Sequence, residues 1–371
     1  MRIEARVPDE VLQRIRAPFR RLDAAGAKPE RIDPPVIQPL DLLLDLSGEA
    51  MRERLFVVQG EDGSEACLRP DFTVPVVRHH LARAQAQASY YYQGQAFRIA
   101  PLGQAERHPS EFLQIGVETF GGAGDEVADA ALAGLAWESA LAGGRDDLSL
   151  RIGDVGFFRA LLADIGVPDA IAHRLRRAFT RPRRLKAEIA RASRAPAERG
   201  PLATASQIEA MWAQLGVEET GGRTAQAVAD RLAARQAEDA LPRLSDEQTR
   251  RIEDYLSISG PPDEVFKRLG DVARGDAFSQ ESRWWSLLIE QLPARGVPAD
   301  RIVFDAGFGG PFSYYDGLVF EIVSDALGAD AAVAAGGRYD TLLAQLAGGG
   351  DFRAAGCMVR PARAWNGAGP Q

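Results

Sequence analysis

The sequence is poor in cysteine, and this scarcity excludes several classes of protein. Only two of the 371 residues are cysteine, Cys67 and Cys357, and they form neither a C-x-x-C pair nor a disulfide framework. Such sparing use of cysteine is typical of a reducing compartment. The four histidines are scattered, and neither they nor the cysteines have the spacing of zinc ligands. We therefore expect no metal and no cofactor.

Long apolar runs and an excess of positive charge are missing too. No apolar stretch reaches the roughly 18 residues of a membrane span, and the charged N-terminus lacks the apolar region of a signal peptide. We predict a cytoplasmic protein with no membrane partner. The net charge is -8. Because a phosphate backbone attracts excess Lys and Arg, this acidic chain is not expected to bind nucleic acid. Neither of the two glycine-rich nucleotide fingerprints, G-x-G-x-x-G and G-x-x-x-x-G-K-[ST], occurs.

The remaining composition, 46% hydrophobic and 26% charged, is that of an ordinary globular protein. Strand-like alternation occurs near both ends of the chain, while residues 166–273 have helical periodicity, Arg and Ala runs and few strand signals. This order predicts an α+β fold, with an antiparallel sheet flanked by helices. We expect a discontinuous core formed by residues 1–165 and 274–371, and a helical insertion module at 166–273.

Polar side chains follow several of the predicted strands. Gln114, Gly116 and Glu118 alternate along one strand, so their side chains share a face. Two carboxylates, an amide and a phenol on one concave face suit a small cationic ligand. The alternative is that Gln114 and Glu118 lie on the solvent face of a half-buried strand. The other candidates follow a Leu-Arg-Pro turn or open a later strand: Asp71, Thr73, Tyr314 and Tyr315.

Two arginine features allow more than one interpretation. Arg98 ends a predicted strand, and its fork of donors can hold a carboxylate or phosphate, or form a surface ion pair. The strongly basic stretch 173–194 fits a docking face for an acidic partner or nucleic acid. It also fits a solvated, Arg-rich pair of helices.

These segments resemble the catalytic core of class II aminoacyl-tRNA synthetases, and of histidyl-tRNA synthetase in particular. The proline-bearing stretch DPPVIQP at 33–39 resembles the class II dimer-interface motif. The other matching segments are LRPDFTVPVVRHHL (68–81), QGQAFR (93–98), EFLQIGVETFG (111–121), SYYDGLVFEIV (313–323) and AAGGRYDTLL (334–343).

The resemblance carries the family's histidine pocket onto this sequence. Asp71 takes the place of a glutamate that anchors the substrate amino group, together with a residue that matches Thr73. Arg98 matches the arginine that grips the carboxylate and the ATP α-phosphate. Gln114 and Glu118 match the polar pair on the pocket floor, and Tyr314 and Tyr315 match the tyrosines on the imidazole side. The resemblance thus implies a histidine-binding site.

The family's adenylating residues are not carried over. Where synthetases have R-H-E-R-P, this chain has R-I-A-P-L from Arg98. The arginine that stabilises charge on the phosphate is replaced by Gly310, and the final G-L-E-R motif reads R-P-A-R at 360–363. Removal of such an electrostatic donor costs a few kcal/mol of transition-state stabilisation. We expect no catalytic residues and no anticodon-binding domain.

A histidyl-tRNA-synthetase-like chain with these losses resembles the regulatory subunits of ATP phosphoribosyltransferase, which catalyses the first step of histidine biosynthesis. This resemblance implies a non-catalytic homodimer that activates a short-form catalytic subunit and makes it sensitive to L-histidine. An alternative is a truncated synthetase paralogue that still activates an amino acid or acts on another acceptor. A third is an RNA-binding module that uses the basic stretch at 173–194.

Overall fold

The computed structural model describes residues 4, 6–21, 28–47, 49–60, 63–100, 108–122, 124–194, 203–216, 224–239, 243–310 and 312–367. Nine strands of these residues form one mixed sheet in the order β1-β5-β6-β12-β11-β10-β7-β9-β8. Their bounds are β1 (Glu30–Arg31), β5 (Ala88–Phe97), β6 (Glu111–Phe120), β7 (Leu148–Asp154), β8 (Ser259–Gly260), β9 (Ile302–Asp305), β10 (Leu318–Ser324), β11 (Ala334–Arg338) and β12 (Ala354–Val359).

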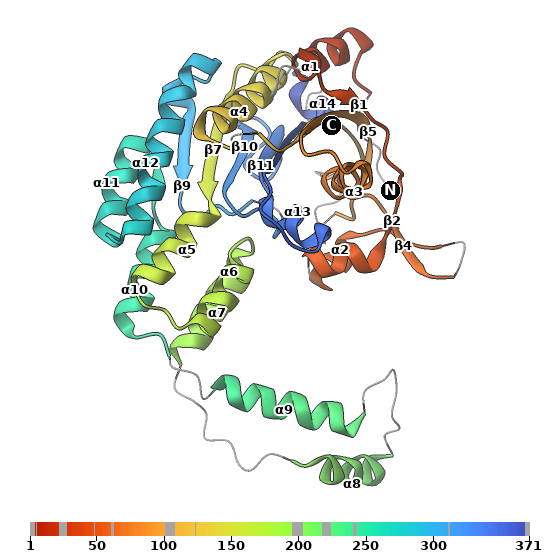
Figure 1. Ribbon diagram of the computed structural model, residues 1–371, viewed down its shortest axis with the longest axis vertical. Helices are drawn as coiled ribbons and strands as arrows, with labels where there is room; N and C mark the ends of the chain where they lie inside the picture. The colour runs from red at the N-terminus through yellow and green to blue at the C-terminus, as the bar shows by residue number, and fades with distance from the viewer. Residues whose placement is uncertain are drawn as a thin grey trace.

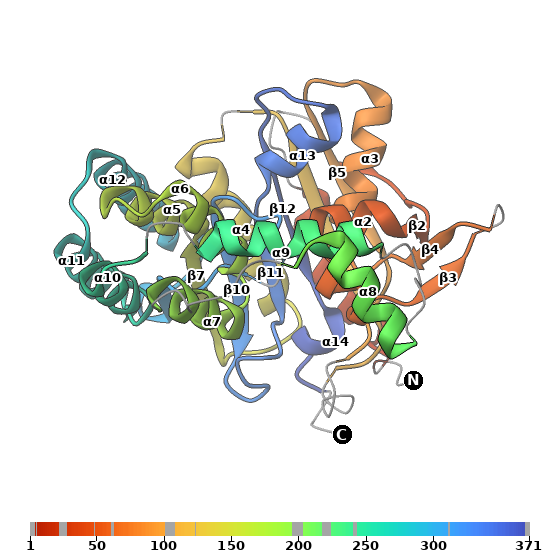
Figure 2. The same ribbon diagram turned by 90° about the horizontal axis from the view of Figure 1, so that it is seen from below.

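Most neighbours in this sheet are antiparallel, as the sequence predicts, and the pairs β1–β5 and β7–β9 are parallel. The strands β5 and β6 pair along their whole lengths, from Ala88 opposite Phe120 to Phe97 opposite Glu111. Residues 101–107 between them lie outside the described residues. A smaller sheet, in the order β2-β4-β3, projects at one edge of the molecule (Figure 2). Its strands are β2 (Ile37–Pro39), β3 (Val57–Gln59) and β4 (Glu65–Leu68).

Helices cover both faces of the large sheet (Figure 1). The α-helices are α1 (Asp9–Arg21), α2 (Leu40–Ser47), α3 (Thr73–Arg83), α4 (Glu126–Leu141), α5 (Val155–Asp164), α6 (Asp169–Ala178), α7 (Pro182–Ser193), α8 (Ala205–Leu215), α9 (Ala225–Asp239), α10 (Asp246–Leu256), α11 (Pro262–Val272), α12 (Asp276–Gln291), α13 (Asp340–Ala347) and α14 (Pro361–Ala364). Short 3-10 turns lie at Glu49–Arg54, Pro293–Arg295 and Ala299–Arg301. None of the described helices is long and apolar enough to cross a membrane.

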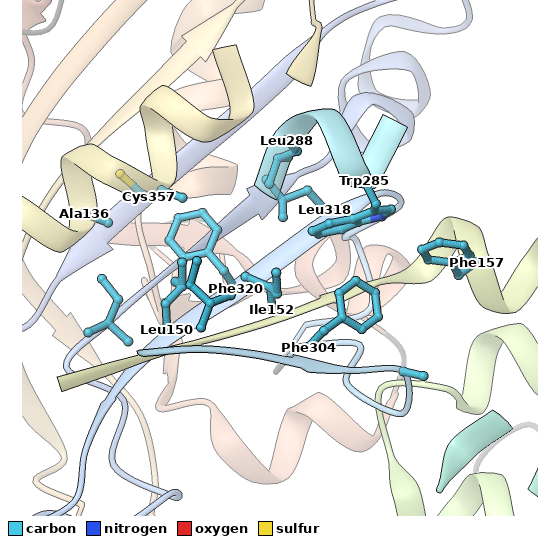
Figure 3. Packing of buried hydrophobic residues seen from close by; sticks show 14 of the residues in the cluster. Ala136, Leu150, Ile152, Phe157, Trp285, Leu288, Phe304, Leu318, Phe320 and Cys357 are labelled. Carbon is cyan, nitrogen blue, oxygen red and sulfur yellow. The ribbon is translucent and has the colours of Figure 1, made fainter. Parts of the chain in front are cut away.

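One face of the sheet packs on α4, α5 and α12 and forms the larger hydrophobic core. The Ala-rich α4 lies close against β10, β11 and β12, and its first turn is capped by Asp125, whose side chain accepts from the Ala128 N–H. Trp285 and Leu288 of α12 point toward Phe304 and Ile152 of the sheet (Figure 3). Cys357 belongs to this core, and Cys67 is also buried and free.

The second hydrophobic cluster lies on the opposite face, between the sheet and the helices α2, α3 and α13. Strand alternation divides β6 between the two faces, because Ile115 and Val117 belong to the first core while Gln114 and Glu118 point the other way. The candidate site therefore lies on the face opposite α4.

The segment 166–273 is mainly helical. Leu175, Ile189, Ile252 and Val265 from four of its helices share the larger core, and β8 within it pairs with β9 of the sheet. The helices α8 and α9 pack on one another apart from the rest of the chain (Figure 1). The domain boundaries proposed from the sequence remain a prediction.

The basic stretch 173–194 forms α6 and α7, which bury Leu175 and Leu185 and leave most of their arginines exposed. Arg174 pairs with Glu188 across 3.4 Å. The prediction of a solvated, Arg-rich pair of helices is confirmed.

One local prediction is wrong. Tyr314 and Tyr315 do not open a strand, because β10 begins at Leu318 after a turn in which the Asp316 N–H donates to the carbonyl of Arg338. Gly336 and Gly337 of the GGRYD segment lie inside β11. A Cβ at Gly337 would lie 2.9 Å from the Tyr315 ring, so this glycine leaves room for the tyrosine.

Candidate ligand-binding site

All seven candidate residues line one cavity of about 320 Å3 on the face of the sheet opposite α4. This volume is within the range of small-molecule sites. The seven residues come from the turn before α3, the end of β5, the middle of β6 and the turn before β10: Asp71, Thr73, Arg98, Gln114, Glu118, Tyr314 and Tyr315. Their convergence excludes the alternative that Gln114 and Glu118 lie on a solvent face, because both are buried.

Glu118 is the most heavily hydrogen-bonded side chain of the cavity. Its Oε1 accepts from the Thr73 hydroxyl across 3.0 Å and from the Tyr92 hydroxyl across 3.3 Å, and its Oε2 accepts from the Tyr339 hydroxyl across 2.5 Å. Burial raises the pKa of Glu118 to about 8, although these three hydrogen bonds oppose the shift. The position of the carboxylate depends on Gly356, because a Cβ there would lie 1.6 Å from Oε2.

Asp71 is the second buried carboxyl of the cavity. Its Oδ1 accepts from the Thr73 N–H across 3.1 Å, which fixes it at the start of α3. Burial raises its pKa, while Arg98, backbone N–H groups and the Tyr314 hydroxyl work in the opposite direction. Neither Asp71 nor Glu118 forms an ion pair within the described part of the chain. This half of the cavity is therefore suited to a cation with several N–H donors.

Gln114 lies between the acidic half and the basic half of the cavity. Its side chain is 0% exposed, and neither its Oε1 nor its Nε2 has a hydrogen-bond partner among the described residues. A buried amide without partners costs free energy unless a ligand or water satisfies it. Gly94 lies opposite Gln114 in the β5–β6 register, so no side chain crowds the amide from that strand.

The basic half contains Arg54, Arg98, Arg360 and Arg363. The Arg98 Nε donates to the carbonyl of Pro70 across 2.7 Å, and its guanidinium lies over the rings of Phe112 and Phe312. Its Nη2 is buried and has no partner among the described residues. A fixed guanidinium with a free donor is suited to a carboxylate.

Part of the cavity wall near Arg363 consists of groups that hydrogen-bond to one another. Arg363 donates to the carbonyl of Ala332 across 2.9 Å and lies 3.3 Å from the Nδ1 of His108. Burial lowers the pKa of Arg363 to about 9, and burial together with Arg363 lowers that of His108 to about 4. Burial also raises the pKa of Glu321 in this wall to about 7. The cavity thus contains both carboxyl and guanidinium groups, as a zwitterionic ligand requires.

Sequence reasoning missed several residues of the site. Tyr92 faces the cavity because it lies opposite Gly116 in the β5–β6 register. Its ring is stacked on Phe72, with centroids 4.2 Å apart. The GGRYD segment alone does not indicate a role for Tyr339, and the sequence shows Arg360 only as a departure from a motif. The alternation of YYYQGQ contained the signal for Tyr92, whereas no local pattern pointed to Gly356.

Known proteins resemble this chain over most of its length. The sequence profile of the family described as histidyl-tRNA synthetase matches residues 29–209 and 201–363. A protein of Mesorhizobium japonicum named "ATP phosphoribosyltransferase regulatory subunit" is 33% identical over 340 residues, covering 87% of this chain and 89% of its own. The protein of the same name from Agrobacterium fabrum is 31% identical, covering 87% of this chain and 88% of its own.

Solved structures share the fold at lower sequence identity. An ATP phosphoribosyltransferase regulatory subunit/histidyl-tRNA synthetase from Bacillus halodurans superimposes with a TM-score of 0.67 at 21% identity, covering 98% of this chain and 82% of its own. The histidyl-tRNA synthetase of Nostoc gives a TM-score of 0.60 at 18% identity, covering 95% of this chain and 69% of its own. The mixed sheet flanked by helices is therefore a class II synthetase-like fold.

Proposed function

The chain belongs to the family of ATP phosphoribosyltransferase regulatory subunits, and we propose that it acts without catalytic residues of its own on a short-form catalytic subunit. In this proposal it activates that subunit in the cytoplasm and makes the complex sensitive to L-histidine. The holoenzyme converts ATP and phosphoribosyl pyrophosphate to phosphoribosyl-ATP and pyrophosphate, and the reacting groups are held by the partner.

Gly310, which lies beside Tyr315, and Arg363 of the cavity support a non-catalytic role. Gly310 stands where synthetases have the arginine that stabilises the reacting phosphate. It has a φ of +74°, and a Cβ there would lie 2.5 Å from Val319 Cγ2. An arginine therefore does not fit this backbone without strain. Arg363 is engaged by Ala332 and His108.

The cavity supports binding of histidine. Asp71 and Glu118 in its acidic half can accept hydrogen bonds from an ammonium group, and Arg98 in its basic half can bind a carboxylate. The observation that carries the proposal is Gln114, a fully buried amide whose two polar atoms have no partner among the described residues. An imidazole offers one donor and one acceptor, which match the oxygen and the nitrogen of this amide.

Regulation by histidine requires a difference in affinity between two states of the complex. A ligand shifts an equilibrium only by its differential free energy of binding, and useful inhibition needs about 1–3 kcal/mol of coupling. We propose that the state with weak activity binds histidine more tightly than the active state.

We propose that the small sheet β2-β4-β3 forms a homodimer interface. Its strand β2 belongs to the segment 33–39 that resembles the class II dimer motif. Val36, Ile37 and Val57 are exposed apolar side chains on this sheet or beside it, which is unusual outside an interface.

The experiment that tests the proposal is co-expression with a short-form ATP phosphoribosyltransferase catalytic subunit. We expect the two chains to co-purify, the activity to exceed that of the catalytic chain alone, and histidine to reduce it. The Glu118→Gln variant should still activate but lose most of the response to histidine. The Glu253→Gln variant, changed at an exposed glutamate of α10, serves as the control.

Pyrophosphate exchange with ATP and histidine tests the synthetase alternative. The isolated chain should show no exchange, whereas exchange above background contradicts the proposal. Failure of the two chains to associate and to gain activity contradicts it as well.

A further inference from the structure

Arg360 lies inside the ligand cavity because of the strand register. It directly follows β12, in which Gly356 pairs with Glu118 and Met358 pairs with Gly116. Alternation places the side chains of Gly356, Met358 and Arg360 on the same face as the polar residues of β6. Arg360 is 5% exposed and lines the cavity together with Arg98.

Arg360 and Arg98 lie close to the same aromatic ring. The guanidinium carbon of Arg360 is 3.9 Å from the centroid of Phe112, and that of Arg98 is 5.3 Å from it. The Nε of Arg360 and the Nη2 of Arg98 are both buried and lack a partner within the described part of the chain. Two buried guanidinium groups thus have donors left for an anion.

Among the described residues, Glu4 is the carboxylate that forms an ion pair with one of these two cations. The Arg360 Nη2 donates to Oε1 of Glu4 across 2.5 Å, and both side chains are nearly buried. The other oxygen of Glu4, Oε2, is also buried and has no partner among the described residues. Glu4 reaches this position from the segment before α1, where its N–H donates to the carbonyl of Glu111 across 3.3 Å.

We propose that Arg360 is a second carboxylate-binding residue of the effector pocket, and that Glu4 occupies it as an internal competitor. The inference rests on the proposed histidine site and adds to it a residue that the synthetase resemblance does not supply. The ligand carboxylate bridges Arg98 and Arg360 and displaces Glu4. The segment before α1 then loses its contact with the cavity and reports that the pocket is filled.

The competition has a thermodynamic consequence. When a site is free for only a fraction of the time, its apparent affinity for a ligand is the intrinsic affinity multiplied by that fraction. Removing the charge of Glu4 while keeping its shape therefore strengthens binding of a ligand that has a carboxylate. It leaves a ligand without a carboxylate unaffected.

The test is isothermal titration of the full chain with L-histidine and with L-histidinol, which lacks the carboxylate. For Glu4→Gln we expect about threefold to tenfold tighter binding of histidine and no change for histidinol. For Arg360→Gln we expect histidine to bind about tenfold more weakly, again without an effect on histidinol. The Glu10→Gln variant, changed at an exposed residue of α1, should behave as wild type.

The double variant Glu4→Gln/Arg360→Gln is the control for misfolding. It removes both charges of the ion pair, so neither charge is left buried without a partner. If Glu4 acts through Arg360, the double variant binds histidine like Arg360→Gln alone. Additive effects, or an equal change for histidinol, overturn the inference. Inorganic phosphate that competes with histidine in wild type and not in Arg360→Gln assigns Arg360 to phosphate, which also overturns it.

Hydrogen exchange of the wild-type protein gives a second readout. Saturating histidine should increase amide exchange in the segment from Glu4 to the start of α1, and histidinol should not. Unchanged exchange in this segment contradicts displacement of Glu4. If wild type binds no histidine at all, the proposed function is wrong. If it binds histidine with an affinity that neither Glu4→Gln nor Arg360→Gln changes, only this inference is wrong.

Discussion

The hydroxyl of Tyr339 donates a hydrogen bond to Oε2 of Glu118 across 2.5 Å. Tyr339 ends the connection from β11 to α13, so this contact ties the pocket floor to a helix on the same face. Its donor stabilises the ionised form of a carboxyl group that burial keeps partly protonated.

Tyr339→Phe should weaken the binding of histidine about tenfold, because a hydrogen bond to a charged group contributes about 1.5–3 kcal/mol. Titration calorimetry at pH 7.5 measures the loss. Tyr92→Phe is the matched control, since its hydroxyl lies 3.3 Å from the same carboxylate and should contribute less. Equal affinities of Tyr339→Phe and wild type would contradict a role of Tyr339 in positioning Glu118.

Histidine binding should strengthen as the pH rises from about 6.5 to 8. The pKa of Glu118 is raised to about 8, and the ligand ammonium prefers the ionised carboxylate, so binding releases a proton. The dissociation constant should fall by up to about tenfold per pH unit in this range and level off above it. Glu118→Gln should abolish this dependence, and an unchanged slope in that variant excludes Glu118 as the linked group.

The same pKa shift makes the unliganded protein less stable as the pH rises, whereas it makes histidine binding stronger. The folded-state pKa of Glu118 lies above the unfolded value, so its contribution is fully present below about pH 4 and is lost as the pH rises through 8. The melting temperature of wild type should therefore fall more between pH 5 and 8 than that of Glu118→Gln.

Gly356→Ala should eliminate histidine binding. The new Cβ would lie 1.6 Å from the Glu118 carboxylate and 2.9 Å from the carbonyl of Val117, so the carboxylate must leave its position. Gly270→Ala in α11 is the control, because no atom lies within 4 Å of its Cβ. The control should gain up to about 1 kcal/mol from helix propensity and bind histidine normally. Normal binding by Gly356→Ala would contradict the site geometry.

Two neighbouring leucines of α12 should differ sharply in their effect on stability. Leu288 is 0% exposed and faces the larger core, so Leu288→Ala should reduce the free energy of unfolding by about 2–5 kcal/mol. Leu287 is 46% exposed, and Leu287→Ala should cost less than about 1 kcal/mol. Urea unfolding measures the free energy of unfolding of both variants. Similar losses for the two would contradict the packing of α12 against the sheet.

Ile37→Asp should convert a dimer to a monomer if the small sheet forms the interface. Ile37 is 57% exposed, so the change costs little within one chain, but a charge would be buried between two. Light scattering after gel filtration measures the mass. Leu215→Asp on α8, another exposed apolar residue, should leave the mass unchanged. A dimer that persists in Ile37→Asp rules out this interface.

The sequence predicted much of the fold because its periodicity was strong where the strands are long. The antiparallel sheet followed from strand alternation, and so did the shared face of Gln114 and Glu118. The cavity itself required the family resemblance, because Asp71 and Tyr314 are far apart in sequence from β6. Local patterns do not report contacts of that kind.

What the sequence does not predict has physical reasons. The missing side chains of Gly336 and Gly337 in β11 admit Phe320 and Tyr315, and no local pattern indicates these contacts. The strand expected at Tyr314 begins later, because the Asp316 side chain accepts from the N–H groups of Asp340 and Thr341 and holds the chain in a turn. Glu4 was overlooked because its partner, Arg360, is 356 positions away.

The division of β6 between two faces makes recognition inseparable from folding. A slip of one residue in its pairing would exchange Gln114 and Glu118 with Ile115 and Val117, placing a carboxyl group against α4 and apolar side chains in the cavity. Such a chain would lose its principal core along with its binding floor. Every molecule that reaches the native register of β6 therefore already has the floor of the binding site in place.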